Sequence, residues 1–344
     1  MIRLLELTYE NLVAAFAKRY EKGPSLAAAA YREFYKQLNP EAWTAKAIGA
    51  SPGLTDRLRK DLAFTPGSVV EETHQDGVVK FITRLGDGHR IESVILPMET
   101  RHTVCLSSQV GCRMGCRFCE TGRLGLVRDL TVEEIVGQVY AVRSRFGKIV
   151  RNVVFMGMGE PFDNFDAVIQ AIKVLSDQRG MNIARRYMTV STAGRIDGIE
   201  KLGAMNMPHL KLVVSLNAPN DKLRAELMPI NNAAPLDALQ KALMAYPLKK
   251  GYDIMIAYVL IPGINDSPDC CRQLADWLAP LRAKVNLIPF NPGTEALYRS
   301  PAMEEIDTFR NRLIAMGVNV QKRLPRGRDL MAACGQLSNG AMAG

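Results

Sequence analysis

From Thr103 onward, apolar segments rich in β-forming residues alternate with amphipathic segments of helical length. The predicted strands are 103–106, 152–156, 186–191, 210–216, 253–261, 284–289 and 317–321. The predicted helices are 131–146, 163–178, 195–204, 235–246, 267–280 and 303–315. Buried strands that alternate with helices pair in parallel through right-handed crossovers. About six such units predict an α/β fold, a partial (β/α)6 barrel, with its chemistry at the carboxyl ends of the strands.

The first 98 residues have a different texture, and we expect two smaller units there. Residues 1–66 are predicted to form a helical module, with helices over Ser25–Leu38 and Leu54–Phe64. Residues 67–98 are predicted to form a small β-meander linker, with strands at 68–73, 78–84 and 90–96 separated by turns that contain glycine. The barrel is then assigned to 99–337, and 338–344 to a flexible tail.

Composition excludes several classes of protein. Of the 344 residues, 47% are hydrophobic and 23% are charged, which is typical of a folded globular protein. The longest apolar run, near 254–261, is too short to span a bilayer, and the first residues are unlike a secretory signal. Seven cysteines, three of them clustered, argue against a disulfide framework. We expect a cytoplasmic protein with no membrane association.

Basic residues outnumber acidic ones. The net charge of +9 favours a polyanionic partner, of which nucleic acid is the commonest, over a merely solvated basic surface. Two segments are candidate phosphate contacts. One is the basic stretch from Lys322 to Arg328, and the other is the Gly49–Gly53 turn with Arg57, Arg59 and Lys60. A solvated run of charge is the alternative for both.

Cys112, Cys116 and Cys119 stand as C-x3-C-x2-C in one loop. Thiolates bind iron–sulfur clusters, and a four-iron cube has four corners to fill. Three ligands leave one iron open, which suits substrate chemistry. A zinc site normally requires a fourth Cys or His, and none of the four histidines follows at such a spacing. Zinc, and three cysteines buried by chance, remain the alternatives.

The position of this loop, directly after the first predicted barrel strand, resembles that in radical S-adenosylmethionine (SAM) enzymes. In that superfamily the open iron is chelated by the amino and carboxylate groups of SAM. An electron from the cluster then cleaves the sulfonium, which is chemistry that belongs to the cofactor. The resemblance implies a [4Fe-4S] cluster and SAM as cofactors, held on a radical-SAM partial barrel.

Polar residues follow several of the predicted strands. Glycines at a strand end let a ligand approach the backbone closely, and Gly159-Glu160-Pro161 resembles the superfamily's site for the SAM amino group. Each of the others is a weak signal alone. Together they predict a ring of contacts to SAM at one face of the barrel: Gly159, Glu160, Ser191, Ser215, Leu216, Asn217 and Asn291.

Two further cysteines lie in segments whose neighbouring residues are informative. Cys105 stands seven residues before Cys112, and Cys334 follows the last predicted strand in Ala332-Ala333-Cys334-Gly335. These segments, with those at 215–220 and 228–231, resemble the RlmN/Cfr family of radical-SAM RNA methylases from about Glu92 to Leu337.

This resemblance implies methylation of an adenine ring carbon, carbon 2 or carbon 8, in ribosomal or transfer RNA, using two SAM per turnover. Cys334 would carry the methyl group, and Cys105 would resolve the adduct and form a disulfide with Cys334. Glu92 occupies the place of the family's proposed general base. Residues 1–66 would then help to bind RNA. A flavodoxin- or ferredoxin-type electron donor is implied, and we expect a monomer.

The chain departs from the well-known members at two positions. Glu120 stands where they carry a small residue, and Asn217 stands where a histidine is familiar. The substrate could therefore differ. The adjacent Cys270 and Cys271 are assigned no role.

Two other functions stay open at this point. One is a radical-SAM enzyme of another class, acting on a different RNA base or a substrate that is not RNA. The other is an iron–sulfur module that binds nucleic acid without catalysis, but this reading leaves Cys105 and Cys334 unexplained.

Overall fold

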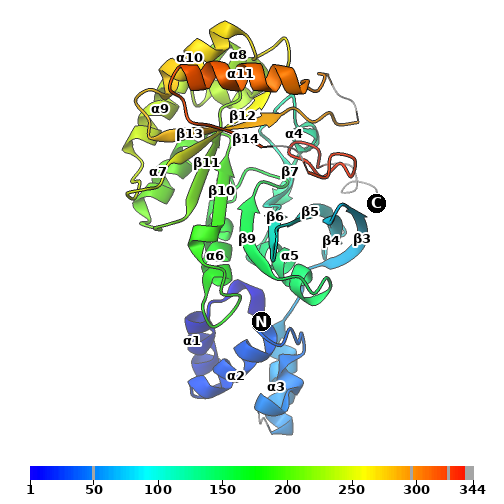
Figure 1. Ribbon diagram of the computed structural model, residues 1–344. Helices are drawn as coiled ribbons and strands as arrows, with labels where there is room; N and C mark the ends of the chain where they lie inside the picture. Colours follow the sequence, from blue (N-terminus) through cyan, green and yellow to red (C-terminus); the bar gives the residue numbers. More distant parts are fainter. Residues whose placement is uncertain (49–50, 295–296, 324–325, 338–344) are drawn as a thin grey trace.

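A ten-stranded sheet organises the computed structural model, which describes residues 1–48, 51–294, 297–323 and 326–337 (Figure 1). Its strand order is β14-β13-β12-β11-β10-β9-β6-β5-β4-β3. Seven strands pair in parallel: β6 (His102–Leu106), β9 (Val150–Phe155), β10 (Met188–Thr192), β11 (Lys211–Ser215), β12 (Ile254–Leu260), β13 (Ala283–Pro289) and β14 (Val320–Lys322). The predicted barrel strands are thus confirmed, although the last begins three residues later than expected.

Helices connect successive strands of the barrel. They are α5 (Val132–Ser144), α6 (Phe165–Ser176), α7 (Ile196–Ala204), α8 (Asp221–Leu227), α9 (Leu236–Ala245), α10 (Pro268–Leu278) and α11 (Met303–Ala315), with 3-10 turns η4 (Arg185–Tyr187) and η5 (Pro229–Asn232). The strands form because β-branched and aliphatic residues are buried on both faces of a parallel sheet: Val190 and Val214 are buried on one face, and Val213 is buried on the other. The structure therefore confirms the partial α/β barrel.

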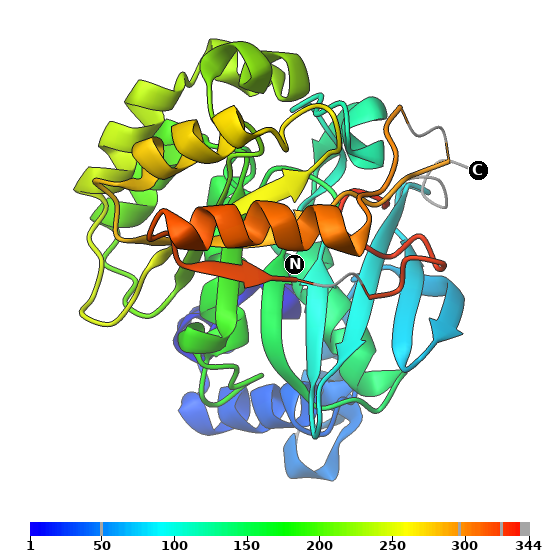
Figure 2. The same ribbon diagram turned by 45° about the horizontal axis from the view of Figure 1, so that its top comes forward.

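The β-meander is continuous with the barrel sheet. Its strands β3 (Ser68–Gln75), β4 (Val78–Arg84) and β5 (Arg90–Pro97) pair antiparallel, and β5 continues onto β6 with Val94 opposite Cys105. The segment that follows β14 lies beside the meander (Figure 2). One contact between the two is the hydrogen bond from Gln75 Nε2 to Asp329 Oδ2, at 2.9 Å. The meander thus supplies one wall of the opening between β6 and β14.

The three-cysteine loop stands on a small ribbon that the sequence did not predict. Strand β7 (Gln109–Cys112) pairs antiparallel with β8 (Gly125–Asp129), and helix α4 (Glu120–Arg123) follows Cys119. Gly111 has a positive φ of 77°, and a Cβ there would lie 1.9 Å from the Gly125 carbonyl oxygen. Only glycine fits at that crossing.

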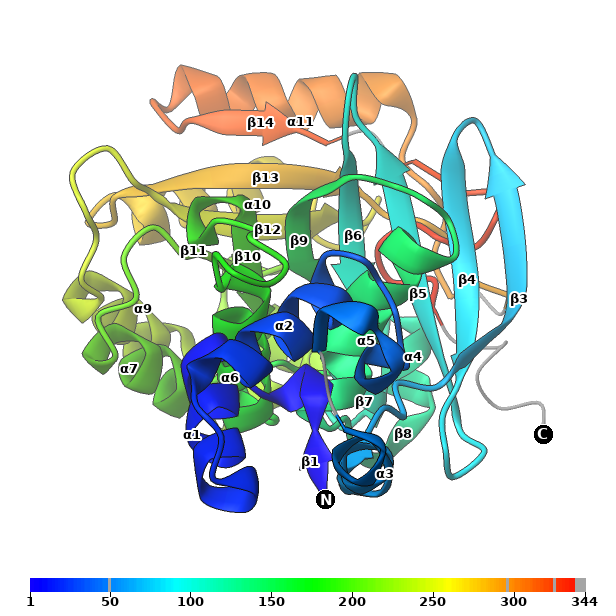
Figure 3. The same ribbon diagram turned by 90° about the horizontal axis from the view of Figure 1, so that it is seen from below.

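A helical module covers the N-terminal side of the barrel, where α1 (Tyr9–Tyr20) was not predicted (Figure 3). Its other elements are β1 (Ile2–Arg3), η1 (Leu4–Glu6), α2 (Pro24–Tyr35), η2 (Ala42–Thr44), η3 (Lys46–Ile48), α3 (Pro52–Asp61) and β2 (Leu62–Ala63). Phe34 of α2 stacks on Tyr140 of α5 with ring centroids 5.2 Å apart. Asp177, which ends α6, accepts hydrogen bonds from the Tyr9 amide and the Tyr31 hydroxyl. Within the described residues, no helix is long and apolar enough to cross a membrane.

Replacing Asp177 by Ala tests how this module is held. The change removes the acceptor of the Tyr9 amide and leaves the Tyr31 hydroxyl only the Leu7 carbonyl at 3.5 Å, so we expect the free energy of unfolding to fall by about 1–3 kcal/mol in urea denaturation. Asp166→Ala, at an exposed position of the same helix, should change it by less than about 0.5 kcal/mol. Equal stabilities of the two variants would contradict this role for Asp177.

Candidate active site

Two connected hollows lie at the open side of the barrel. The inner cavity, about 170 Å³, lies at the carboxyl ends of the strands. The outer cleft, about 920 Å³, opens between β5 and β6 on one side and the segment after β14 on the other. Four residues line both: Met156, Ile288, Arg323 and Cys334. A side chain at this boundary can reach a group in either hollow.

Cys112, Cys116 and Cys119 all line the inner cavity. Cys112 ends β7, Cys119 immediately precedes α4, and burial raises the pKa of all three thiols. Buried thiols of this kind become thiolates when a metal supplies the positive charge. The described residues contain no group of three or more His, Cys, Asp or Glu side chains placed for a single ion. Three thiols around one wall fit the corners of an iron–sulfur cube.

Glu160 faces the same cavity and is almost fully buried. Its Oε2 accepts from the Ala193 amide at 2.7 Å, and its Oε1 accepts from the Phe162 amide at 3.0 Å. Burial raises its pKa to about 7, although these two donors act in the opposite direction. Gly159 must be glycine, since its φ is 103° and a Cβ would lie 2.6 Å from the Gln109 Cβ. The cavity therefore offers a preformed acceptor for a cationic group.

The structure brings most of the predicted strand-end residues together. Gly159, Glu160, Ser191, Ser215 and Asn217 line the inner cavity. Leu216 is buried, and its amide donates to the Ala257 carbonyl; it is not in the described wall of either hollow. Asn291 lines the outer cleft instead, and its Oδ1 accepts from Arg328 at 3.2 Å.

Asn217 has a structural task that the sequence did not indicate. Its φ is 58°, a left-handed conformation that asparagine tolerates better than most residues. Its Oδ1 accepts from the Val259 amide at 2.9 Å, and its Nδ2 lies 3.2 Å from the Met228 sulfur. The side chain therefore joins the ends of β11 and β12.

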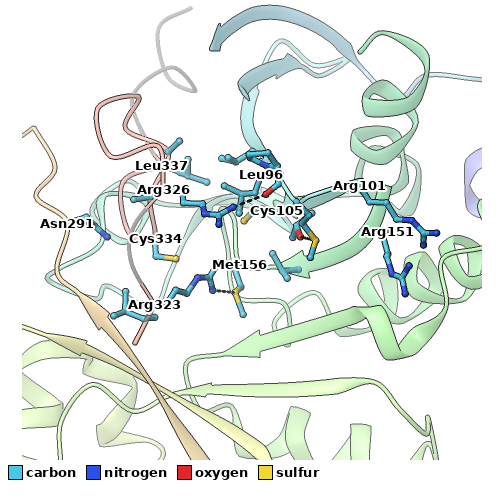
Figure 4. A pocket seen from close by; sticks show the side chains of 18 of the residues that line it. Leu96, Arg101, Cys105, Arg151, Met156, Asn291, Arg323, Arg326, Cys334 and Leu337 are labelled. Atoms are coloured by element: carbon cyan, nitrogen blue, oxygen red, sulfur yellow. Dashed lines mark hydrogen bonds between the residues drawn. The ribbon is translucent and has the colours of Figure 1, made fainter. Parts of the chain in front are cut away.

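Cys334 and Cys105 lie on opposite walls of the outer cleft (Figure 4). Cys334 is exposed, in the loop after β14, and it also reaches the inner cavity. Cys105 is on β6, and its pKa is raised to about 12 by burial and by the neighbouring Cys334, while Arg323 acts in the opposite direction. Both cysteines are free thiols.

Glu92 is close to the cleft but set back from it. Its side chain is buried on β5 and lies 3.6 Å from the Lys80 ammonium. Among the described residues it is not part of the wall of either hollow. Val94, two positions along the same strand, does line the cleft, and residues two apart share one face. The Glu92 carboxylate is therefore on the same face of β5 as Val94, but behind the residues that line the cleft.

The Cys334 loop is fastened to the three-cysteine loop, which sequence reasoning missed. The Glu120 amide donates to the Gly335 carbonyl at 2.8 Å, and the Thr121 hydroxyl donates to the Leu337 carbonyl at 2.5 Å. Gln336 donates to the Pro292 carbonyl at 2.7 Å. Backbone acceptors carry no sequence signature, so no motif marks these contacts in advance.

The side chain of Glu120, which departs from the well-known family members, is buried inside this junction. Its carboxylate fills the space beside Gly293, where a Cβ would lie 1.9 Å from Oε1. Glu120 is buried and is in neither described wall. Its contact is therefore with the loop that carries Asn291, not with the cleft itself.

Basic side chains dominate the outer cleft. Five line it: Arg101, Arg151, Lys322, Arg323 and Arg326. Glu99 is the one acidic residue in the described wall. Arg151 also lies over the Tyr187 ring, 4.2 Å from its centroid. The cleft can therefore attract a polyanion and present planar cations to it.

The other candidate phosphate contacts lie elsewhere. Gly49 and Ala50 of the predicted turn are outside the described residues, as is the predicted tail at 338–344. Arg57 donates to the Arg19 carbonyl, and Arg59 forms an ion pair with Asp56, both in the helical module at the far end from the Cys334 loop (Figure 1). Cys270 and Cys271 are buried in α10, away from both hollows.

Replacing Thr121 by Val tests the fastening of the Cys334 loop. The change removes the hydroxyl but keeps the shape, so amides of 332–337 should exchange hydrogen about five- to tenfold faster, as expected from losing one hydrogen bond. Thr121→Ser retains the donor and should exchange like the wild type. Hydrogen exchange read by mass spectrometry decides, and unchanged exchange in the Val variant would contradict the fastening.

Comparisons with known proteins agree with this geometry. The model of the radical SAM superfamily matches residues 106–274. A probable dual-specificity RNA methyltransferase RlmN 1 of Protochlamydia amoebophila is 40% identical, over 98% of this chain and 94% of that protein. The dual-specificity RNA methyltransferase RlmN of Geobacter sulfurreducens is 42% identical, over 89% of this chain and 85% of that protein.

The fold has a solved counterpart as well. A radical SAM methyltransferase from Sphaerobacter thermophilus superposes with a TM-score of 0.91 at 38% identity, covering 98% of this chain and 99% of that one. The cofactors that this membership implies, a [4Fe-4S] cluster and SAM, fit the three thiols and the carboxylate of the inner cavity. The chain is a SAM-dependent methyltransferase that belongs to the RlmN family of dual-specificity RNA methyltransferases, within the radical SAM superfamily.

Proposed function

We propose that this enzyme methylates a ring carbon of adenine, carbon 2 or carbon 8, in ribosomal or transfer RNA, by way of a methyl group carried on Cys334. The observation that carries the proposal is the position of Cys334. It lies at the boundary between the cavity that holds the three thiols and a cleft large enough for a nucleobase. A carrier that receives a group on one side and delivers it on the other needs this position.

The charge of the outer cleft supports RNA as the substrate. Five basic side chains meet one acidic one in its described wall, and the whole chain carries +9. Phosphate contacts of this kind supply most of the affinity for nucleic acid. The relatives' names point to the same substrate. An enzyme that modifies a base usually takes that base out of its stack, and the cleft leads to both cysteines.

Residues of the inner cavity would hold the cofactors. Cys112, Cys116 and Cys119 would bind three irons of the cluster, and Glu160 would accept from the SAM ammonium. Ser191 and Ser215 line the same space and offer hydroxyls to the rest of SAM. When bound, the cluster and SAM supply one-electron chemistry that can remove a hydrogen atom from an unactivated C–H group.

This radical chemistry is needed because of the low reactivity of the adenine ring carbons toward SAM. The two adenine carbons are electrophilic, so they do not attack the methyl group of SAM directly. The Cys334 thiolate would attack it, taking the methyl group of one SAM as a thioether. The same sulfur would then hold that methyl carbon beside the ring while a second SAM, bound in the inner cavity, supplied the radical chemistry. Covalent carriage of this kind divides one hard step into easier ones.

Cys105, on the wall of the outer cleft opposite Cys334, is proposed to release the product. Attack by the Cys105 sulfur on the Cys334 sulfur would break the bond between Cys334 and the transferred carbon. That carbon would keep the bonding pair and take a proton to become the methyl group, and the two cysteines would be left as a disulfide. Glu92 is proposed as the general base, acting from behind the cleft wall. The reductant is proposed to be a flavodoxin- or ferredoxin-type protein, and a monomeric state stays a prediction.

The two departures from the well-known members do not redirect the proposal. Glu120 fills a space inside the loop junction, and Asn217 fixes the ends of two strands. Neither places a new group in the outer cleft. Incubating the reconstituted enzyme with SAM, a reductant and total RNA, followed by nucleoside mass spectrometry, would name the modified carbon. The absence of any methyladenosine would count against the proposal.

Replacing Cys334 by Ala tests the carrier. The wild-type protein should show a mass increase of one methyl group on Cys334, and the variant should form no methylated RNA because the carrier is gone. Cys270→Ala is the matched control, since Cys270 is buried in α10 and should leave both results unchanged. Full activity in the Cys334 variant would overturn the covalent route.

The affinity for SAM should depend on pH through Glu160. Only the ionised carboxylate attracts the SAM ammonium, and its pKa in the free protein is about 7. Affinity should therefore rise as pH increases through about 7 and level off above it. Glu160→Gln should remove this dependence and weaken binding about 10- to 100-fold at high pH, as expected for a charge-assisted hydrogen bond. Isothermal titration measures both, and a flat wild-type profile would contradict the role.

The same group affects the stability of the free protein in the opposite direction. Its folded pKa, about 7, lies above the ordinary value of 4.5. The neutral form is therefore favoured by folding, and this contribution is complete below 4.5 and is lost as pH rises through 7.

A further inference from the structure

Arg224 on α8 is completely buried, and its whole guanidinium is used inside the protein. Nε donates to the Leu216 carbonyl at 3.2 Å. Nη1 donates to Asn231 Oδ1 at 3.0 Å and to the Ala234 carbonyl at 3.1 Å. Nη2 donates to the Ala193 carbonyl at 2.7 Å and to the Ser215 carbonyl at 3.5 Å. All five N–H groups of the side chain thus have acceptors.

None of these acceptors carries a negative charge. In the part of the chain that the structure describes, no ion pair joins Arg224 to a carboxylate; Asp221 is connected to it only through Asn231, whose Nδ2 donates to Asp221 Oδ1 at 2.9 Å. A buried charge without a partner of opposite sign is costly, even when its hydrogen bonds are made. Burial lowers the pKa of Arg224 to about 10, and Cys116 and Asp221 act in the opposite direction. The group is therefore still a cation at neutral pH. The end of its helix packs against the cluster loop: Leu227 and Met228 share one apolar cluster with Cys116, and the Arg117 amide donates to the Leu227 carbonyl at 3.0 Å.

Three of the acceptors, Ala193, Ser215 and Leu216, lie at the carboxyl ends of two strands that face the inner cavity. Ala193 follows β10, and Ser215 ends β11. Ala193 takes part twice, because its carbonyl accepts from Arg224 and its amide donates to Glu160. The backbone is shaped to admit the side chain, since a Cβ on Gly194 would lie 2.8 Å from Nη2.

We propose that Arg224 is a positioning residue with two tasks: it fixes the ends of β10 and β11 around the Glu160 carboxylate, and it supplies the buried counter-charge for the thiolates that hold the cluster. The proposal rests on the proposed ligand set, Cys112, Cys116 and Cys119. A three-thiolate [4Fe-4S] cluster carries a net negative charge, which becomes more negative on reduction. A nearby buried cation therefore favours the reduced state, because little solvent screens the interaction.

Two variants separate the tasks. Arg224→Gln removes the charge and most of the donors, so the reduction potential of the reconstituted cluster should become more negative and the SAM affinity should fall. Arg224→Lys keeps the charge but loses the planar fork. Its potential should stay close to that of the wild type, while its SAM affinity should fall about tenfold or more.

The exposed Arg117, which follows Cys116, is the control for charge near the cluster. Arg117→Gln should leave the potential almost unchanged, because water screens an exposed charge. Anaerobic redox titration and isothermal titration give the two readouts. A potential in Arg224→Gln equal to that of the wild type, or a Lys variant that keeps full SAM affinity, would overturn the proposal.

If the Gln variant does not fold, the Lys variant alone decides: a shifted potential there contradicts the counter-charge, and unchanged SAM affinity contradicts the bracing. Failure of the ligand set would look different. Wild-type protein reconstituted without iron uptake would remove the cluster itself, whatever happens at Arg224. Urea unfolding of the metal-free proteins shows how much stability the hydrogen bonds alone contribute, so a purely structural role can be recognised.

Discussion

The contact between two loops, one with the cluster cysteines and one with Cys334, is the constraint on which the site depends. It is made through the backbone of the C-terminal loop, with donors from Glu120 and Thr121 at the start of α4. Cys119 immediately precedes those donors. The thiol that would bind iron and the thiol that would carry the methyl group are therefore held near each other by these two hydrogen bonds. The fold therefore fixes the position from which Cys334 can reach both the inner cavity and the outer cleft.

The barrel explains why the two hollows meet where they do. Parallel strands deliver Glu160, Ser191 and Ser215 to one edge, and the open side between β6 and β14 admits the basic cleft. Family membership contradicts the reading as a non-catalytic module, and the cofactors that it implies favour an iron–sulfur cluster at the three cysteines over zinc or chance burial. What distinguishes the two hollows is chemistry: one is lined by thiols and strand ends, and the other by arginine and lysine.

Periodic features were predictable from sequence, and contacts with backbone atoms were not. The barrel strands and helices were found because burial imposes a regular apolar pattern. The β7–β8 ribbon was missed because its strands are four and five residues long and depend on glycine geometry at Gly111. Helix α1 was also missed, although Thr8 caps it by accepting from the Asn11 amide. For the site, spacing identified the three cysteines, but nothing in the sequence marks Thr121 or Arg224, whose partners are carbonyl groups.

The central claim is that three thiols hold a cluster with one iron open to SAM beside Cys334. Electron paramagnetic resonance of the anaerobically reconstituted and reduced protein, with and without SAM, tests it most directly. The account predicts a [4Fe-4S] signal that changes shape when SAM is added, since SAM then occupies the open iron. A cluster signal that is identical with and without saturating SAM would contradict it.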